Sequence, residues 1–439
     1  MEAKRFDLGA VTVTVTVTVT VTVNGTAGLD RRVAREVKPM IVLLIGTIVL
    51  VLFSTLSQPL SRCGVTSAMV FVTAGIVLGT AAPGPLSPAV DSTVVEHVTE
   101  LALVFLLFTD AARLDLGLLR RSPGWPGRLL LIGLPLTLLL GLGVGLLLFP
   151  GLPLASVFLL STMLCATDAA LGQRVVDDTA LPARVRESLT VESGLNDGIA
   201  VPFFLVSLDI TMATLEGSVP SAVAAAVVEE IGLGAAAGLA VGGAGGYILR
   251  TARARDWLQR EWVQPLTLAV ALGAYAAAGT LGGSVFIAAF VGGMAFLLTG
   301  GSGTKDATRF TADTGSVLAA ATWMVFGAVA VLAALPYLSW AVLFYALLSL
   351  TVVRMLPVFL AMAGSGADWQ TKAFMGWFGP RGLASVVFGL LAYERGIPAA
   401  GTLLATVVTT VLLSVFAHGL SAGPLIAAYH RVSGQGSGK

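Results

Sequence analysis

Apolar stretches of roughly membrane-crossing length follow one another along almost the whole chain from Met40, separated by short polar or glycine-rich connections. A helix needs roughly 20 apolar residues to cross the hydrocarbon core of a bilayer. The pattern therefore predicts helices, and we expect thirteen of them to span a membrane. Their ranges are 40–57, 65–81, 94–112, 128–149, 153–172, 188–210, 221–249, 263–281, 283–299, 312–334, 337–361, 372–391 and 401–424. Only Gly282 and Gly283 separate the eighth range from the ninth.

Polar residues are rare inside these ranges, and the sixth range carries a dense group of them. It lies in the segment RESLTVESGLNDGIAVPFF, residues 186–204. Glu192 precedes Asn196 by four residues, and Ser193 precedes Asp197 by the same spacing. Residues four apart share one face of a helix, so each pair is expected to stack there.

A second acid, Asp168, falls within the fifth range. Carboxylates in hydrocarbon are costly, and they usually face a bundle interior or a water-filled cavity, where they mark an ion or proton path. Two such acids from neighbouring helices, with hydroxyl and amide oxygens beside them, suit a small hard cation that prefers oxygen ligands. The pattern favours a cation/proton exchanger. Asp110, at the inner end of the third range, is expected at the membrane interface instead.

Composition agrees with the hydropathy pattern. Of the 439 residues, 56 % are hydrophobic and only 12 % are charged, whereas a soluble domain has about a quarter charged. The chain is therefore expected to be an all-α polytopic membrane protein. A net charge of +1 gives no reason to expect a nucleic-acid partner, and the two cysteines imply no disulfide framework.

The charges between the ranges give an independent prediction of topology. Seventeen basic residues fall in one alternating set of connections and only Arg395 in the other. Basic residues stay cytoplasmic, so we expect the N-terminus outside and the C-terminus inside. The basic residues Arg31, Arg32, Arg35 and Lys38 contradict this pattern, because they precede the first range on the outer side.

The start of the chain is expected to lie outside the transport domain. Residues 11–23 read VTVTVTVTVTVTV, a low-complexity repeat without a predicted partner strand. We interpret residues 1–39 as a low-complexity and basic tail that contributes nothing to transport, and we expect the functional protein to begin at or near Met40. The alternative is that the tail stays cytoplasmic and the first range inserts differently. The transmembrane domain is then residues 40–425, followed by a short cytoplasmic tail over 426–439.

Thirteen helices divide as six, one and six. This permits two repeats of inverted topology, residues 40–210 and 263–425, joined by a linking helix over 221–249, as in many secondary transporters. Interrupted helices at matching positions of two repeats indicate a site at the membrane midplane. The fifth range holds Asp168, and the twelfth holds Gly379, Pro380, Arg381 and Gly382, which break a helix.

These motifs resemble a known family. The segments CATDAALGQRVV, RVRESLTVESGLNDGIAVPF and GWFGPRGLASVVF are similar to those of the CPA1 monovalent cation/proton antiporters, the NhaP/NHE-like sodium/proton exchangers. The similarity covers essentially 40–425. It implies a homodimer in the cell membrane, with a dimerisation domain and a mobile core domain in each protomer. It also implies a role in pH homeostasis and no cofactor besides the transported Na⁺ and H⁺.

The resemblance also implies roles for individual residues. Asp168 and Asp197 match the acids that bind the ion, and Thr167 and Ser193 lend further oxygens. Asn196, in place of a second aspartate, resembles the electroneutral members. Where the family often has proline after the first aspartate, this chain has Ala169, so a break in the fifth helix is less strongly indicated.

Glu192 matches a glutamate that the family pairs with an arginine of the eleventh helix, here Arg354. Such a pair is expected to join the sixth and eleventh helices, because an unpaired buried charge is costly. Arg381 is the alternative partner. Its other expected role is to offset helix ends at the break in the twelfth helix.

The expected function is exchange of Na⁺, with Li⁺ as a further candidate, for H⁺ by alternating access. A K⁺/H⁺ antiporter on the same scaffold stays open, and so does an uncoupled cation channel. An intramembrane hydrolase is disfavoured, because the sequence has no HExxH, no GxGD and no credible Ser–His pair. The protein is therefore expected to be a transporter and not an enzyme.

Overall fold

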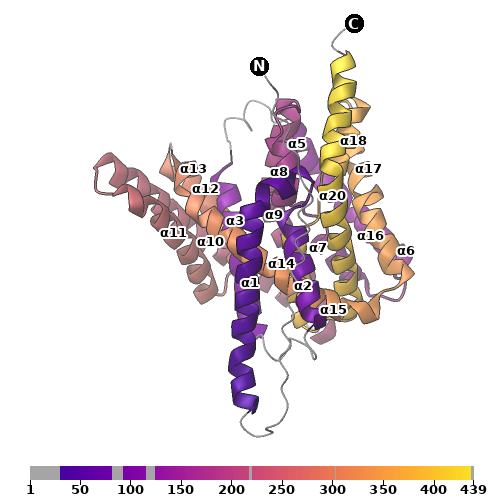
Figure 1. The fold of residues 1–439 in the computed structure, drawn as a ribbon, viewed down its shortest axis with the longest axis horizontal. Helices are drawn as coiled ribbons and strands as arrows, with labels where there is room; N and C mark the ends of the chain where they lie inside the picture. The colour runs from indigo at the N-terminus through magenta and orange to yellow at the C-terminus, as the bar shows by residue number, and fades with distance from the viewer. Residues whose placement is uncertain (1–29, 82–91, 115–123, 217–219, 302, 437–439) are drawn as a thin grey trace, which may run out of the picture.

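The structure is a computed structural model that describes residues 30–81, 92–114, 124–216, 220–301 and 303–436. These residues form a bundle of helices (Figure 1). No strand occurs in the described part of the chain. The VT repeat lies outside it.

Within the described residues, the first half of the bundle contains eight helices and one π-helical turn. They are α1 (Asp30–Arg62), α2 (Ser67–Ala81), α3 (Ser92–Ala112), α5 (Gly124–Arg128), the π turn η1 (Leu129–Gly133), α6 (Leu134–Leu148), α7 (Leu154–Met163), α8 (Ala169–Asp177) and α9 (Ala183–Glu216). α5, η1 and α6 run on without a gap and form one span of residues 124–148.

The second half begins with α10 (Pro220–Ala254) and ends with the long α20 (Ala400–Gly436). Between them lie η2 (Arg260–Trp262), α11 (Val263–Leu281), α12 (Val285–Gly300), α13 (Thr304–Ala307), α14 (Arg309–Val325), η3 (Phe326–Ala330), α15 (Val331–Ala334), η4 (Leu335–Tyr337), α16 (Trp340–Leu350), α17 (Val352–Ala361), α18 (Trp369–Trp377) and α19 (Leu383–Glu394). α11 and α12 are separate helices, because Gly282 ends α11 in the left-handed conformation.

The helices agree with the hydropathy pattern, which confirms an all-α membrane protein. Within the described residues, eight helices are long and apolar enough to cross a membrane, and four shorter helices are also apolar. Every one of the thirteen predicted ranges falls on helix, some of it interrupted. The number of actual crossings stays a prediction.

Two boundaries differ from those expected. α1 begins at Asp30, ten residues before Met40, so the basic segment continues the first helix. At the other end, α20 continues to Gly436, well past the expected end of the transmembrane domain. Hydropathy predicts where a helix enters the polar region, and helical hydrogen bonding continues beyond that point in water.

The helices pack as two groups. In one group α10 lies along α12, α3 lies against α12 and α14, and α2 against η3. In the other, α7 packs on α9, α16 and α19 on α20, and α17 on α18. Figure 1 shows α10 to α13 on one flank and α6, α16, α17 and α20 on the other. α1 lies in front of them, and its span, Leu43–Arg62, has no buried residue.

Glycines bring α10 and α12 into backbone contact. A β-carbon at Gly238 would lie 2.5 Å from the carbonyl oxygen of Ala288, and one at Gly242 would overlap the carbonyl of Gly292. Gly234 and Gly246 meet α12 in the same way one turn before and one turn after. Small residues at this spacing allow close helix packing in membranes. The α10–α12 pair is therefore tightly joined along its length.

Candidate functional site

Two interrupted helices meet inside the bundle. α7 ends at Met163 and α8 begins at Ala169, while α18 ends at Trp377 and α19 begins at Leu383. The unwound segments touch where the backbone N–H of Asp168 donates to the carbonyl of Pro380 over 2.8 Å. The predicted crossing of broken helices is confirmed, and the fifth helix breaks although Ala169 replaces proline.

Asp168 joins both interrupted helices through its carboxylate. Oδ1 accepts a hydrogen bond from the N–H of Leu171 over 3.1 Å, which caps the N-terminus of α8. Oδ2 accepts from the N–H of Leu383, the first residue of α19, over 2.8 Å. The acid therefore satisfies backbone donors of two half-helices that have no helical partner.

A compact group of polar side chains lies beside Asp168, between the α7–α8 break and α9. The amide of Asn196 donates to Oγ1 of Thr167 over 2.5 Å, and its Oδ1 accepts from the Thr167 N–H over 3.3 Å. Oγ1 of Thr167 also lies 3.3 Å from Oγ of Ser193. All three residues are buried. Asn196 thus holds Thr167 with both ends of its amide.

Asp197 is the least satisfied member of the group. Its Oδ1 is buried and has no hydrogen-bond partner among the described residues. Its carboxylate interacts electrostatically with Asp168 and with Asp110. The structure thus brings together Asp168, Asp197, Thr167, Ser193 and Asn196.

Asp110 was expected at the membrane interface, and its place relative to the bilayer stays a prediction. It lies two residues before the end of α3, and its charge acts on both Asp168 and Asp197. Hydropathy alone did not indicate its proximity to the other two acids, because hydropathy does not distinguish a helix end at the bilayer boundary from a helix end that faces the bundle interior. Only the rarity of negatively charged residues within membrane-spanning segments could have indicated this role.

Glu192 forms a bidentate ion pair with Arg354. Nη1 of Arg354 donates to Oε1 over 2.5 Å and Nη2 to Oε2 over 3.0 Å. Both side chains are buried, and the pair links α9 to α17. Fork-to-fork geometry of this kind gives strong charge-assisted hydrogen bonds. Of the two arginines considered from the sequence, Arg354 is the one that contacts Glu192.

Arg381 acts at a helix end, but not at the one expected. Its Nη1 donates to the carbonyls of Cys165 and Ala166, over 2.8 and 2.9 Å, where the chain leaves α7. The negative end of the fifth helix therefore meets a positive charge from the twelfth. The expectation that Arg381 offsets its own helix is wrong, because its unwound backbone turns the side chain toward the neighbouring break.

Two residues of α20 complete the crossing and were not identified from the sequence. Oγ of Ser414 accepts from the N–H of Arg381 over 2.7 Å, and Nε2 of His418 donates to the carbonyl of Trp377 over 2.8 Å. Both are buried. They bind backbone groups at the break in the twelfth helix, where the carbonyl of Trp377 also accepts from the N–H of Gly379. The sequence indicates these two residues through their spacing, because a serine and a histidine four residues apart share one face of an apolar helix.

A comparison with protein families decides the identity of the fold. The family described as "Sodium/hydrogen exchanger, transmembrane" matches residues 40–428. The chain belongs to the sodium/hydrogen exchanger family. The match covers both interrupted helices and the polar group between them.

Relatives and solved structures agree with this membership. Na(+)/H(+) antiporter 2 of Zygosaccharomyces rouxii is 29 % identical over 260 residues, 54 % of this chain and 31 % of that protein. K(+)/H(+) antiporter NhaP2 of Shewanella sp. strain ANA-3 is 26 % identical over 388 residues, 86 % of this chain and 65 % of that protein. The chain therefore spans about one to two thirds of the length of these curated relatives.

The fold is similar to that of the sodium proton antiporter MjNhaP1 from Methanocaldococcus jannaschii at pH 8. The TM-score is 0.72, over 89 % of this chain and 99 % of that chain, at 20 % sequence identity. At this identity the likeness establishes the fold alone. Together with the family match, it identifies this sodium/hydrogen exchanger family member as an integral membrane protein.

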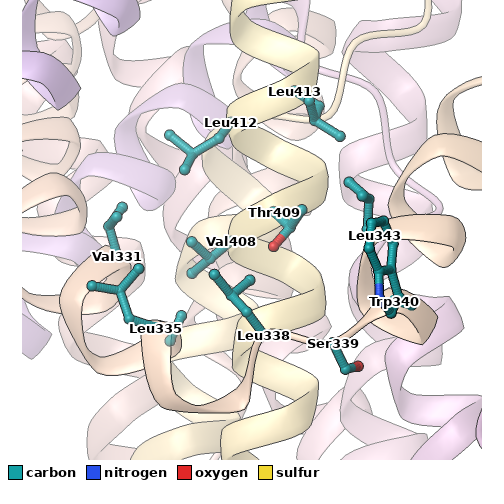
Figure 2. A pocket seen from close by; sticks show the side chains of 11 residues that line it. Val331, Leu335, Leu338, Ser339, Trp340, Leu343, Val408, Thr409, Leu412 and Leu413 are labelled. Carbon is teal, nitrogen blue, oxygen red and sulfur yellow. The ribbon is translucent and has the colours of Figure 1, made fainter.

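A pocket elsewhere in this family member is separate from the acids. It has a volume of about 580 Å³ and lies between the η4–α16 segment and α20 (Figure 2). Leu335, Leu343 and Leu412 are among the residues that line it, and Ser339 and Thr409 carry hydroxyl groups there. Among the described residues that line it, none is charged. Its chemistry does not fit a cation.

Gly382 is where the crossing of this family member has least room. A β-carbon there would overlap the side chain of Asp168, and an inserted methyl forces its neighbours to move. We therefore expect Gly382→Ala to lower cation-driven proton movement about ten-fold or more. Proteoliposome flux and melting temperature measure the effect. Gly143→Ala in α6 is the matched control, since no atom lies within 4 Å of its β-carbon. Equal effects of the two variants would contradict the proposed contact.

Proposed function

We propose that this protein exchanges Na⁺ for H⁺ across the membrane, with Asp168 and Asp197 as the acids that bind either ion. The observation that carries the proposal is the buried Oδ1 of Asp197, which has no hydrogen-bond partner among the described residues and lies near a second acid. A buried polar atom without a partner is costly, and a proton or a cation would supply that partner. Membership of the exchanger family supports the same conclusion.

The chemistry of the group suits competition between the two ions. Two nearby carboxylates repel each other as anions, so binding one proton or one cation relieves the repulsion. The hydroxyls of Thr167 and Ser193 lie within the same group and would add oxygen ligands for Na⁺ or Li⁺. In alternating access, the neutralised acids cross the barrier, whereas the bare anionic pair does not.

One cation per proton is the proposed stoichiometry. The position before Asp197 is an amide, Asn196, which does not titrate and is engaged with Thr167 at both ends. Its proposed role is therefore to hold Thr167 in place. Glu192 and Arg354 neutralise each other and are proposed to join α9 to α17 without taking part in the exchange.

K⁺/H⁺ exchange is the second candidate. The relative that matches the larger share of this chain carries the name K(+)/H(+) antiporter NhaP2. The oxygen ligands are compatible with either monovalent cation, and the size of the space between the acids decides between them.

The remaining expectations follow from the resemblance and the charge pattern. We propose a homodimer in the plasma membrane, with the N-terminus outside and the C-terminus in the cytoplasm. The excess of basic residues in one alternating set of connections between the predicted ranges supports this orientation.

Ion-dependent proton movement in proteoliposomes tests the function. The purified full chain is reconstituted with a pH-sensitive dye inside, and Na⁺, Li⁺ or K⁺ is added outside at equal concentration. We expect Na⁺ and Li⁺ to drive protons out, with a weaker response to K⁺. A response to K⁺ alone would assign the second candidate. Cation flux without matching proton movement would indicate a channel and contradict exchange.

A further inference from the structure

The helix that carries Asp197 meets α12 where the ring of Phe290 lies against Gly198, the residue after Asp197. Gly198 is buried, and a β-carbon there would overlap Cγ, Cδ2 and Cε2 of Phe290. The ring therefore lies directly against the α-carbon of Gly198. Any side chain at position 198 would displace either the ring or α9, and a shift of α9 would move Asp197 with it.

Phe290 projects from a fixed support. On one side α12 is joined to α10 by the backbone contacts of Gly238 and Gly242. On another side, a β-carbon at Gly293 would overlap the carbonyl of Phe108 in α3. Helices in backbone contact cannot shift past each other without a clash.

Further aromatic rings of α9, α12 and α19 contact one another near this point. Phe286, one turn earlier on α12, meets the ring of Phe388 in α19 edge-on, with centroids 6.4 Å apart. Phe388 in turn stacks on Phe204 of α9 at 4.2 Å. All three are buried. We call Phe204, Phe286, Phe290 and Phe388 the aromatic seal. It lies on the side of Asp197 toward the α11–α12 connection.

We propose that Phe290 is a positioning residue for exchange, and that its contact with Gly198 sets the position of Asp197 relative to α12. With the rest of the aromatic seal, the ring closes the route between Asp197 and the α11–α12 end of the bundle. The proposal rests on Asp197 being an exchanging acid. It adds the contact that sets the position of Asp197 and the end of the bundle from which ions reach this acid.

Paired substitutions at the contact test the proposal. In proteoliposomes, Gly198→Ala is expected to lower the maximal rate of Na⁺-driven proton movement about ten-fold and to raise the half-saturating Na⁺ concentration, because the added methyl displaces α9. Phe290→Ala is expected to let protons leak when no cation is added. Combining the two should restore the half-saturating Na⁺ concentration to within about two-fold of the Phe290→Ala value, since the overlap is gone.

Gly194→Ala provides the matched control on the same helix. Its β-carbon would lie 3.6 Å from Cδ2 of Leu114, an ordinary contact, so both kinetic values should stay near those of the parent. If Gly194→Ala is as impaired as Gly198→Ala, helix packing in general is responsible and the proposal fails. It also fails if the double variant is as impaired as Gly198→Ala alone, or if Phe290→Ala shows no proton leak.

Melting temperatures separate this proposal from the proposed function. If the parent protein moves no protons in response to Na⁺, the exchange assignment fails. The melting temperatures of the variants then test the Phe290–Gly198 contact on their own. Gly198→Ala should lower the melting temperature, and Phe290→Ala in that background should raise it again. Additive losses would overturn the contact independently of any transport result.

Discussion

Asp197→Asn is expected to reduce cation-driven proton movement to that of empty vesicles while the protein stays folded and inserted. An amide of the same size carries no negative charge and binds no proton at neutral pH, so neither ion has a site. Because Oδ1 of Asp197 has no partner among the described residues, the substitution breaks no recorded hydrogen bond at this atom. The melting temperature should therefore stay equal or rise.

Asp168→Asn is expected to abolish exchange as well, but with a loss of stability. Its two carboxylate oxygens accept from Leu171 and Leu383, and an amide can accept through only one of its two end atoms. Asp313→Asn, at an exposed position of α14, is the control and should leave both measurements unchanged. Exchange retained in either Asp197→Asn or Asp168→Asn would overturn the assignment of the acids.

Glu192→Ala and Arg354→Ala are each expected to destabilise the protein strongly, by about 3–5 kcal/mol if the pair behaves as other buried ion pairs. Each substitution leaves a buried charge without its bidentate partner. The double variant should recover a substantial part of the loss, because no uncompensated charge stays behind. Thermal unfolding in detergent, followed for both single variants and the double variant, measures the coupling.

Arg381→Met supplies the control for that cycle. The side chain of Arg381 is buried and donates to the carbonyls of Cys165 and Ala166, and its charge interacts with Glu192 and Arg354 without a hydrogen bond to either. Its removal in the Glu192→Ala background should therefore recover much less of the loss than removal of Arg354 does. Recovery with Arg381→Met, together with simple additivity for Arg354→Ala, would reverse the assignment of the partners.

The sequence predicted the features that depend on the bilayer. A hydrocarbon layer demands apolar helices of a certain length, so the ranges, the α11–α12 boundary and the helix class followed from hydropathy. The rarity of acids in such a layer likewise indicated Asp168 and Asp197. The Gly379–Gly382 segment indicated one break directly, because proline and glycine disrupt helical hydrogen bonding.

Features that depend on irregular backbone could not be predicted in this way. The eleventh helix is interrupted at Thr351, between α16 and α17, where neither glycine nor proline stands. Arg381 turns toward the α7 end because its backbone is unwound, and helical periodicity does not apply there. The roles of Asp110 and Asn196 depend on side-chain directions that residue spacing alone leaves open.

The joined helices α10 and α12 have a consequence for how this sequence can evolve. At Gly234, Gly238, Gly242 and Gly246, no other residue fits without separating the two helices, so these positions tolerate almost no substitution. Neighbouring exposed positions such as Leu239 need only remain apolar. Mutational drift is therefore expected to change the outward surface of this pair freely while its internal seam stays constant.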